Sequence, residues 1–328
     1  MIKPNLPLLV SAVLTLAACK GRVETTALPA TDDSTAIRLA VMPVLDCLPF
    51  YYAEQEGLFD SVGLKVRLKT FRAAMDADTA FRGTTADAIC TDLVKACIWR
   101  SGGDSVKAVM ATRLDLYLLT AYSARIRQTA SLKEKIIGIT RNSAVDLVTD
   151  EILSQAKLLS TDLNKPQINN VELRCYMVDQ NQYDGALLPE PYASECEARG
   201  ARRIAGTPEL GLKLGVLVVR DSLARRSKDI SLLRQAYDLA VGQLNERLAK
   251  RAATPADTSL LAITDQPVWE PMQYFPQEFR LNMPDSLVAY PTFTTAGQVA
   301  EAEFNRVKNW CKGRDLLRRD FGLQELMP

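Results

Sequence analysis

The sequence predicts a layered α/β fold built as two lobes, and three observations support this. From residue 37 onward, short apolar runs alternate with segments of helical periodicity, a pattern typical of sheets covered by helices. The chain has 328 residues, and single cores tend to divide beyond roughly 250 residues. An extended run at 114–122 follows the strand before it without an intervening helix, so it could leave one sheet for another. A strongly apolar run at 214–219 should then bring the chain back.

Residues 1–18 are predicted to be a signal peptide and not part of the fold. Lys3 supplies a positive start, and the apolar run at 6–18 is far shorter than the roughly 20 residues of a membrane span. The run Leu-Ala-Ala-Cys, ending at Cys19, resembles the lipobox of bacterial lipoproteins; an ordinary secretory signal is the alternative. On the lipobox interpretation, Cys19 is acylated and anchors the chain to a membrane, and 19–36 forms a flexible tether.

Charge and composition exclude several classes of function. Without Lys3, the 40 basic residues become 39, equal to the 39 acidic ones, so no electrostatic footprint for nucleic acid is present. The chain has no histidine, which excludes Ser-His-Asp and Cys-His catalysis and His-ligated zinc. Six cysteines follow Cys19 and form no CxxC motif, so we expect neither a metal nor another cofactor. We interpret them as small buried hydrophobic residues, although some could pair in an oxidising envelope: Cys47, Cys90, Cys97, Cys175, Cys196 and Cys311.

The first lobe is predicted from strands and helices in strict alternation. Strands are expected at 37–42, 66–71, 86–90 and 106–111, and helices at 49–58, at 76–82 and over the apolar positions 93–98. After the second lobe, a long helix is expected at 230–248, because apolar residues line one face of it. A segment at 255–291, rich in Pro and aromatic residues, should wrap over the first lobe, and a last helix is expected at 299–310. The first lobe therefore comprises 37–114 and 220–328.

The second lobe, 115–219 with its crossover segments, is predicted from a similar alternation. Strands are expected at 136–140, 171–176 and 185–188. A helix should follow Ser143, which forms an S-x-x-D capping pattern with Asp146, and its apolar residues recur at helical spacing as far as 159. Another helix is expected at 191–199, ended by Gly200.

Polar residues follow four of the predicted strands, where ligands of open α/β sheets bind. Asp46, Cys47 and Leu48 precede Pro49, whose missing N–H costs nothing at the first helical position. The corresponding places in the other three loops are occupied by Thr91 and Asp92, by Asn142 and Ser143 after Arg141, and by Glu190. Each could instead cap a helix or complement its dipole. Because four loops share this placement, two in each lobe, we expect a ligand cleft between the lobes.

Five segments, in order, resemble a known family. They are LPFYYAEQEGLFDSVGLKVRL from Leu48, TTADAICTDL, IIGITRNSAVDLVTDEIL, GALLPEPYASECEARGARRI and FNRVKNWCKGRDLL. The family is that of periplasmic substrate-binding proteins of the nitrate/sulfonate/taurine and thiamine-pyrimidine precursor type. The resemblance implies a type II periplasmic-binding-protein fold whose lobes close on a small ligand. It also implies an ABC permease and ATPase as partners, and a monomer on the periplasmic side of the cell envelope. The implied pocket residues are Asp46, Cys47, Leu48, Pro49, Thr91, Asp92, Asn142, Ser143 and Glu190.

The charges of these loops give a first hypothesis for the ligand. Asp46, Asp92 and Glu190 outnumber Arg141, which favours a neutral or cationic heterocycle such as an aminopyrimidine. Helix N-termini favour anions, so a sulfonate, nitrate or taurine-type ligand is the alternative. A sensor lipoprotein without a transporter is a further possibility. Enzymes of this fold fit less well. A thiamine-pyrimidine synthase that resembles these binding proteins implies a histidine, which this chain lacks. Menaquinone-pathway lyases of the same fold are cytosolic, and the lipobox argues against that location.

Overall fold

The computed structural model describes residues 35–253, 269–283 and 289–328. The predicted signal peptide, Cys19, most of the tether and part of the aromatic segment lie outside these residues. The strands are β1 (Ile37–Val41), β2 (Val66–Thr70), β3 (Ala88–Asp92), β4 (Val106–Thr112), β5 (Leu116–Thr120), β6 (Ile137–Gly138), β7 (Gly185–Pro189), β8 (Arg202–Gly206) and β9 (Gly215–Arg220).

The helices lie between these strands and after them. They are α1 (Leu48–Gln55), α2 (Leu58–Ser61), α3 (Ala74–Arg82), α4 (Leu93–Gly102), α5 (Ala144–Gln155), α6 (Val171–Asp179), α7 (Tyr192–Ala198), α8 (Thr207–Leu210), α9 (Asp221–Ala224), α10 (Ser227–Ala253), α11 (Glu301–Gly313) and α12 (Leu323–Leu326). Helices α1, α3, α4, α5, α7, α10 and α11 are close to their predicted places, whereas α6, α8, α9 and α12 were not predicted as helices. The short 3₁₀ helices used below are η1 (Leu45–Cys47) and η6 (Glu270–Tyr274).

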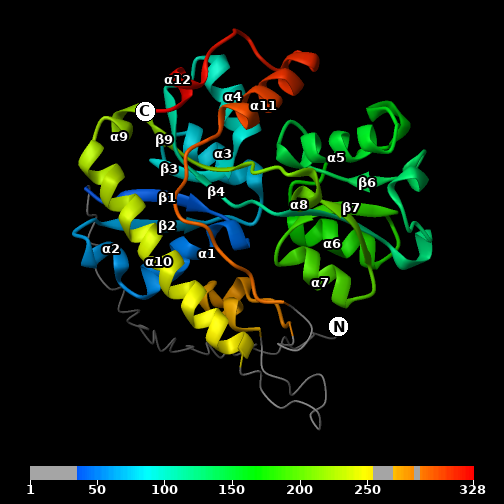
Figure 1. Ribbon diagram of the computed structural model, residues 1–328, viewed down its shortest axis with the longest axis horizontal. Coiled ribbons are helices and arrows are strands. Elements are labelled where there is room, and N and C mark those ends of the chain that lie inside the picture. Colours follow the sequence, from blue (N-terminus) through cyan, green and yellow to red (C-terminus); the bar gives the residue numbers. More distant parts are fainter. Residues whose placement is uncertain (1–34, 254–268, 284–288) are drawn as a thin grey trace, which may run out of the picture. The chain divides into compact units, whose positions relative to one another are not determined.

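The first sheet has the strand order β2-β1-β3-β9-β4. Strands β2, β1 and β3 run parallel, whereas β9 is antiparallel to both of its neighbours, β3 and β4 (Figure 1). Strand β9 lies between β3 and β4 in the sheet, although β5 to β8 separate it from them in the sequence. The return crossing accordingly lies at 211–214, before β9, because residues 215–219 of the run predicted to cross already pair within the first sheet.

The second sheet has the order β6-β7-β5-β8, with β6 parallel to β7 and β5 antiparallel to β7 and β8. Two predictions fail in this part of the chain. Strand β8 was not expected, and the strand predicted at 171–176 is wrong, because these residues begin helix α6. The side chain of Asn170 caps this helix by accepting a hydrogen bond from Leu173 N at 2.9 Å. Its buried residues follow helical spacing: Val171, Arg174, Cys175 and Val178.

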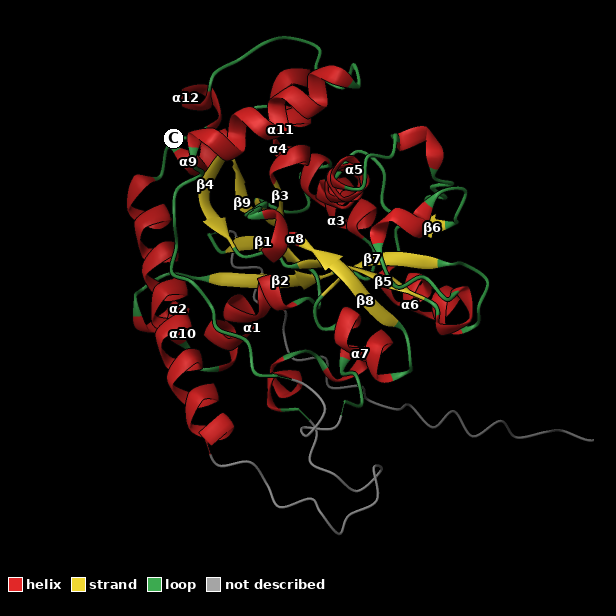
Figure 2. Cartoon of the chain, turned by 45° about the vertical axis from the view of Figure 1, so that its right-hand side comes forward, coloured by secondary structure: helices red, strands yellow, loops and turns green. Residues whose placement is uncertain are grey.

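Helices cover both faces of both sheets, as predicted. Buried apolar residues form two clusters, and each cluster runs across both sheets, on one face of them. One contains residues of α1, α10, α6 and α7, and the other contains residues of α3, α4, α11 and α5 (Figure 2). Residues 35–328 accordingly form one compact unit by their contacts, and the predicted boundaries of the lobes within it stay predictions.

The two connections between the sheets lie next to each other. The outgoing connection, 113–115, starts after Thr112, which pairs with Gly215 at the end of the incoming one. Leu116 N also donates to Thr207 Oγ1 at 3.0 Å, which joins the start of β5 to α8. Both crossings therefore meet at one point, beside the ends of β4 and β9.

The described part of the aromatic segment packs on α1, as the predicted wrap requires. Tyr51 meets Phe275 edge to face at 5.2 Å between ring centroids, and Tyr52 meets Tyr274 at 4.9 Å. The six cysteines after Cys19 are buried and unpaired, which agrees with their interpretation as small hydrophobic residues. Of the helices in the described ranges, none combines the length and apolar character needed to span a bilayer.

Candidate functional site

A small cavity lies where strand ends of the two sheets face each other. It is lined from the first sheet by residues of η1, β3, α3 and α4, and from the second by residues before and within α5 and α6. Its volume is about 80 Å³. A cavity of this size holds several water molecules or one small solute. Much of its wall is apolar: Met42, Val44, Ala74, Ala77, Ile89, Leu114, Leu116, Ala144, Val145 and Val171.

The structure brings five of the nine predicted pocket residues to this cavity: Asp46, Cys47, Thr91, Asp92 and Ser143. Leu48 and Pro49 begin α1 and are buried without lining it. Asn142 instead lines an adjacent opening together with Arg141. Its backbone N–H donates to Asp146 Oδ2 at 3.1 Å, so the expected S-x-x-D capping contact is displaced by one residue.

Glu190 lies after β7, outside this cavity, beside a second opening. Its carboxylate accepts from Ser194 N at 3.0 Å and pairs with Arg203 at 2.8 Å. These contacts agree with the alternative given for Glu190, in which it complements the start of a helix. Its backbone carbonyl also accepts from Leu45 N at 2.8 Å, which ties the two sheets together beside the cavity.

Two of the cavity residues cap helices. Asp92, which is 7% exposed, precedes α4 and accepts from Lys95 N at 3.0 Å. Ser143 precedes α5, accepts from Val145 N at 3.2 Å and donates to Thr140 O at 2.7 Å. Burial raises the pKa of Asp92 to about 6, although Lys95 and the backbone amide of Ala144 act against this rise. Both side chains therefore have partners within the protein.

A buried ion pair also lines the cavity, and sequence reasoning missed it. Lys95 on α4 pairs with Asp78 on α3, and both side chains are largely buried. Burial raises the pKa of Asp78, and the charge of Lys95 acts against this rise. Because the two charges offset each other, this pair leaves little net charge for a ligand.

Asp46 is different, because it has no charged partner. It lies on η1, is 7% exposed, and accepts a hydrogen bond from Cys90 Sγ through Oδ2 at 3.3 Å. Its Oδ1 atom has no partner of hydrogen-bonding geometry among the described residues. Burial raises the pKa of Asp46 to about 6. Gly215 lies against it, since a Cβ there would be 2.4 Å from Thr112 Oγ1 and 3.1 Å from Asp46 Oδ1.

Arg174 is the candidate site residue that sequence reasoning missed most clearly. It lies on α6, is 2% exposed and lines the cavity from the second sheet. Its Nε and Nη1 atoms have no hydrogen-bond partner, and no ion pair involves it within the described ranges. Burial alone lowers its pKa to about 10. The available signal was the helical spacing of Val171, Cys175 and Val178, which would have placed Arg174 on the same helix.

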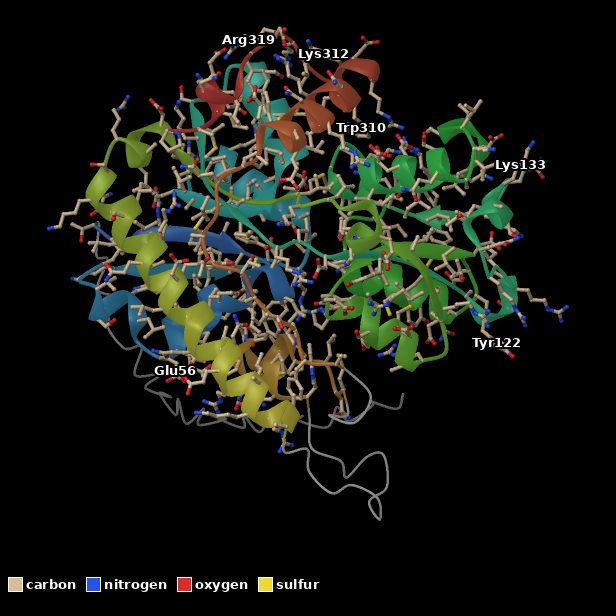
Figure 3. All side chains as sticks on the ribbon, viewed as in Figure 1. Glu56, Tyr122, Lys133, Trp310, Lys312 and Arg319 are labelled. Atoms are coloured by element: carbon tan, nitrogen blue, oxygen red, sulfur yellow. The ribbon has the colours of Figure 1, made fainter. Side chains whose placement is uncertain are left out.

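Helix α11 and Arg314, the residue that follows it, hold the rim of the cavity at α5. Trp310, labelled in Figure 3, donates from Nε1 to Asp150 Oδ2 at 2.9 Å. Arg314 donates to Asp146 Oδ2 at 2.8 Å, and Arg306 pairs with Glu151 at 2.9 Å. These contacts fix α5, whose N-terminus borders the cavity, against a helix that packs on α4.

In the described ranges, no group of three or more Cys, Asp or Glu residues is placed to hold a metal ion. No protein-family model matches the sequence. No curated protein matches it either.

Solved structures do resemble the chain. The ligand-binding component of an ABC-type import system from Staphylococcus aureus, with zinc bound, has a TM-score of 0.70 at 14% identity, over 90% of this chain and 96% of that one. The alkanesulfonate-binding protein SsuA from Xanthomonas axonopodis pv. citri, bound to MOPS, has a TM-score of 0.71 at 16% identity, over 90% and 98%. The nitrate-binding protein NrtA from Synechocystis PCC 6803 has a TM-score of 0.63 at 11% identity, over 81% and 74%.

These similarities confirm the predicted fold class. The chain has the two-lobed α/β fold of periplasmic binding proteins, type II, with helices on both faces of each sheet.

Proposed function

We propose that the chain is the solute-binding component of an ABC-type import system. The observation that carries this proposal is the cavity enclosed between strand ends of both sheets, because a solute held there contacts both lobes at once. Structural similarity to binding components of import systems supports it. The solute would then be delivered to a membrane permease driven by an ATPase.

Binding would act through an equilibrium between open and closed arrangements of the lobes. A ligand that contacts both lobes favours the closed arrangement, and moving from mostly open to mostly closed needs roughly 5 kcal/mol of differential affinity. Binding at a micromolar Kd corresponds to about 8 kcal/mol and is sufficient. The permease would then recognise the closed form.

The proposal includes a lipid anchor at Cys19, so that the protein is held on the periplasmic side of the cell envelope. The motif before Cys19 supports this, and two acyl chains suffice for stable anchoring. Incorporation of a fatty-acid analogue into the full chain, and its loss in Cys19→Ser, is the expected result.

Binding is favoured over catalysis by the chemistry of the cavity. The chain has no histidine to act as a base. Hydrogen bonding with Cys47 and burial raise the pKa of the Cys90 thiol well above its ordinary value, so this thiol stays protonated and is a poor nucleophile. Recovery of the bound solute chemically unchanged is expected, and its conversion to another compound would favour an enzyme.

Two ligand classes follow from the sequence, a cationic or neutral heterocycle and an anion. The excess of Asp46, Asp92 and Glu190 over Arg141 in the loops favours the heterocycle, yet Asp92 caps a helix and Glu190 lies outside the cavity. Arg174, with no partner for Nε or Nη1, supports an anionic group on the ligand. Nitrate and sulfonates, as in the similar solved proteins, belong to that alternative.

The experiment is a thermal-shift screen of the mature protein against nitrate, alkanesulfonates, aminosulfonates and aminopyrimidines, followed by calorimetry. One class should raise the melting temperature and bind at micromolar Kd. Deleting the gene should abolish uptake of that solute by cells, whereas a sensor without a transporter would leave uptake unchanged. Failure of every solute class to bind with a Kd below about 1 mM would contradict the proposal.

A further inference from the structure

Two segments, one connected to each sheet, contact each other directly at one edge of the cavity. Residues 72–75 follow β2 of the first sheet and begin α3. Residues 169–172 begin α6, which leads into β7 of the second sheet. The backbones of Ala73 and Asn170 pair as an isolated antiparallel bridge. We call these two segments, 72–75 and 169–172, the latch.

Side-chain contacts reinforce the latch. Arg72 Nη1 donates to both carboxylate oxygens of Glu172, at 3.0 and 3.1 Å. The same guanidinium lies 4.5 Å from the centre of the Phe279 ring. Asn169 Nδ2 donates to Met75 Sδ at 3.5 Å. The side chains of Arg72 and Glu172 are 46% and 38% exposed, so water screens their charges and the pair can break at a modest cost in free energy.

The latch forms part of the cavity wall. Ala74 and Val171, one from each segment, line the cavity. Met75 and Asn169 border an adjacent opening of about 210 Å³. Three residues line both spaces: Asp78, Lys95 and Thr140. Separating the two segments of the latch would therefore connect the cavity to the solvent.

The latch also lies far from the crossings between the sheets. Strand β2 forms one edge of the first sheet, whereas β9 and β4, whose ends carry the two crossings, lie at the other. When two bodies rotate about a pivot, the parts farthest from the pivot move most. A rotation about the crossings at 113–115 and 211–214 would therefore separate the two sheets most at the latch.

A second contact between the sheets, that of α5 with Arg314 and α11, is more deeply buried. Arg314 pairs with Asp146 at 2.8 Å and with Asp150 at 3.0 Å. The two carboxylate side chains are only 2% and 15% exposed. Breaking charge pairs as buried as these costs more free energy than breaking an exposed pair. The α5–α11 contact should therefore stay intact when the latch separates.

We propose that the cavity opens at the latch, between residues 72–75 and 169–172, while the crossings and the α5–α11 contact stay in place as the pivot. This inference rests on the proposed function and specifies where the solute enters. Because the latch forms between protein groups alone, part of the stability of the closed arrangement does not come from a ligand. The latch therefore sets the fraction of open molecules in the protein without solute.

The cavity contains its own reporters of opening, the thiols of Cys47 and Cys90. Both line the cavity and both are buried, so a reagent in solution reaches them when the cavity opens. Four further cysteines of the described residues are buried outside the cavity lining: Cys97, Cys175, Cys196 and Cys311. The experiment is alkylation of the full chain by iodoacetamide, with the rate at each cysteine followed by mass spectrometry. When opening and closing are faster than alkylation, this rate is proportional to the fraction of open molecules.

Two matched variants locate the opening. Glu172→Gln removes the negative charge of the latch and should speed the alkylation of Cys47 and Cys90 roughly threefold. Glu151→Gln removes the same charge from the pair with Arg306 at the α5–α11 contact, where the two atoms are 2.9 Å apart. It should leave the rates at both cavity thiols unchanged, because this contact does not separate on opening.

The four cysteines outside the cavity lining distinguish opening from loosening of the whole fold. In Glu172→Gln their rates should stay those of the parent protein. Equal acceleration of all six thiols would overturn the inference, and so would unchanged rates at Cys47 and Cys90. Faster alkylation of these two thiols in Glu151→Gln than in Glu172→Gln would place the opening at the other contact and would also overturn it. Because no solute is used, any of these failures leaves the proposed transport function to its own test.

Discussion

Two parts of the cavity, the surroundings of Asp92 and those of Asp46, differ in how the protein treats a buried carboxylate. Both side chains are 7% exposed, and burial raises the pKa of each to about 6. Asp92 nevertheless accepts a hydrogen bond from the N-terminus of α4 and lies near Lys95, whereas Asp46 has the Cys90 thiol and the Thr112 hydroxyl beside it and no cation. The difference teaches that burial alone does not mark a binding residue. Burial without a charged partner is what makes Asp46 a candidate for binding.

The largest expected effect is the dependence of the free energy of unfolding on the protonation of Asp46. Because the folded pKa of Asp46 is about 6 against an ordinary value of 3.8, the folded state binds the proton more tightly. The contribution of Asp46 to stability should therefore fall by roughly 3 kcal/mol as pH rises from about 4 to about 6. Asp46→Asn should remove this contribution and leave the similar one of Asp92, whose pKa is also raised to about 6. Urea unfolding at pH 4 and pH 7.5 measures it, and a difference between the two proteins that stays constant with pH would contradict it.

The next effect concerns the glycine that makes room for Asp46. A Cβ at Gly215 would be 2.4 Å from Thr112 Oγ1 and 3.0 Å from Thr112 O, so neighbouring backbone has to move. Gly215→Ala should lower the free energy of unfolding by about 2 kcal/mol. Gly242→Ala, on the long helix α10, has no atom within 4 Å of the new Cβ and serves as the control. Equal stability of the two variants would show that the close approach carries no strain.

A smaller effect is expected where a polar group of the cavity is already satisfied. Ser143→Ala removes the side-chain acceptor of Val145 N and the donor to Thr140 O. The cost of losing such a cap is about 1 kcal/mol, measured by chemical unfolding. Ligand affinity should stay within about threefold of the parent, because the hydroxyl is used within the protein. A large loss of affinity would move Ser143 into the group of residues that bind the ligand.

The smallest effect is expected for a charge pair on the surface. Arg225 pairs with Asp221 at 2.9 Å, and its side chain is 73% exposed. Arg225→Met should change the free energy of unfolding by less than about 0.5 kcal/mol, because water screens such pairs. A larger loss, measured by urea unfolding, would show that pairing matters at the surface as much as at the cavity.

Local sequence patterns predicted most of the strands and helices, because each depends on periodicity within a few residues. The strand predicted at 171–176 is wrong because the spacing of Val171 and Cys175 fits both an apolar run and a helical face. Packing against the sheet, which local sequence does not reveal, favours the helix. Strand β8 was missed because it is short, only partly buried and rich in arginine.

The sequence predicted which residues lie at the candidate site, from their places at strand ends, but not which hydrogen-bond or ion-pair partners they have. Strand-end placement led to Asp46, Cys47, Thr91, Asp92 and Ser143, which the structure brings to one cavity. Whether a carboxylate is capped, paired or left alone depends on residues distant in the sequence, such as Asp78 beside Lys95 or Arg203 beside Glu190. Counting charges along the loops could not reveal this, and it also passed over Arg174.

The place of β9 has a consequence for how the chain acquires its fold. This strand lies between β3 and β4, yet it follows the whole second sheet in the sequence. Until residues 215–220 are available, β3 and β4 each present an unpaired edge, and such edges promote aggregation. A nascent chain truncated before β9 should therefore need a chaperone to avoid aggregation. In such a chain the first sheet lacks the strand that joins β3 to β4.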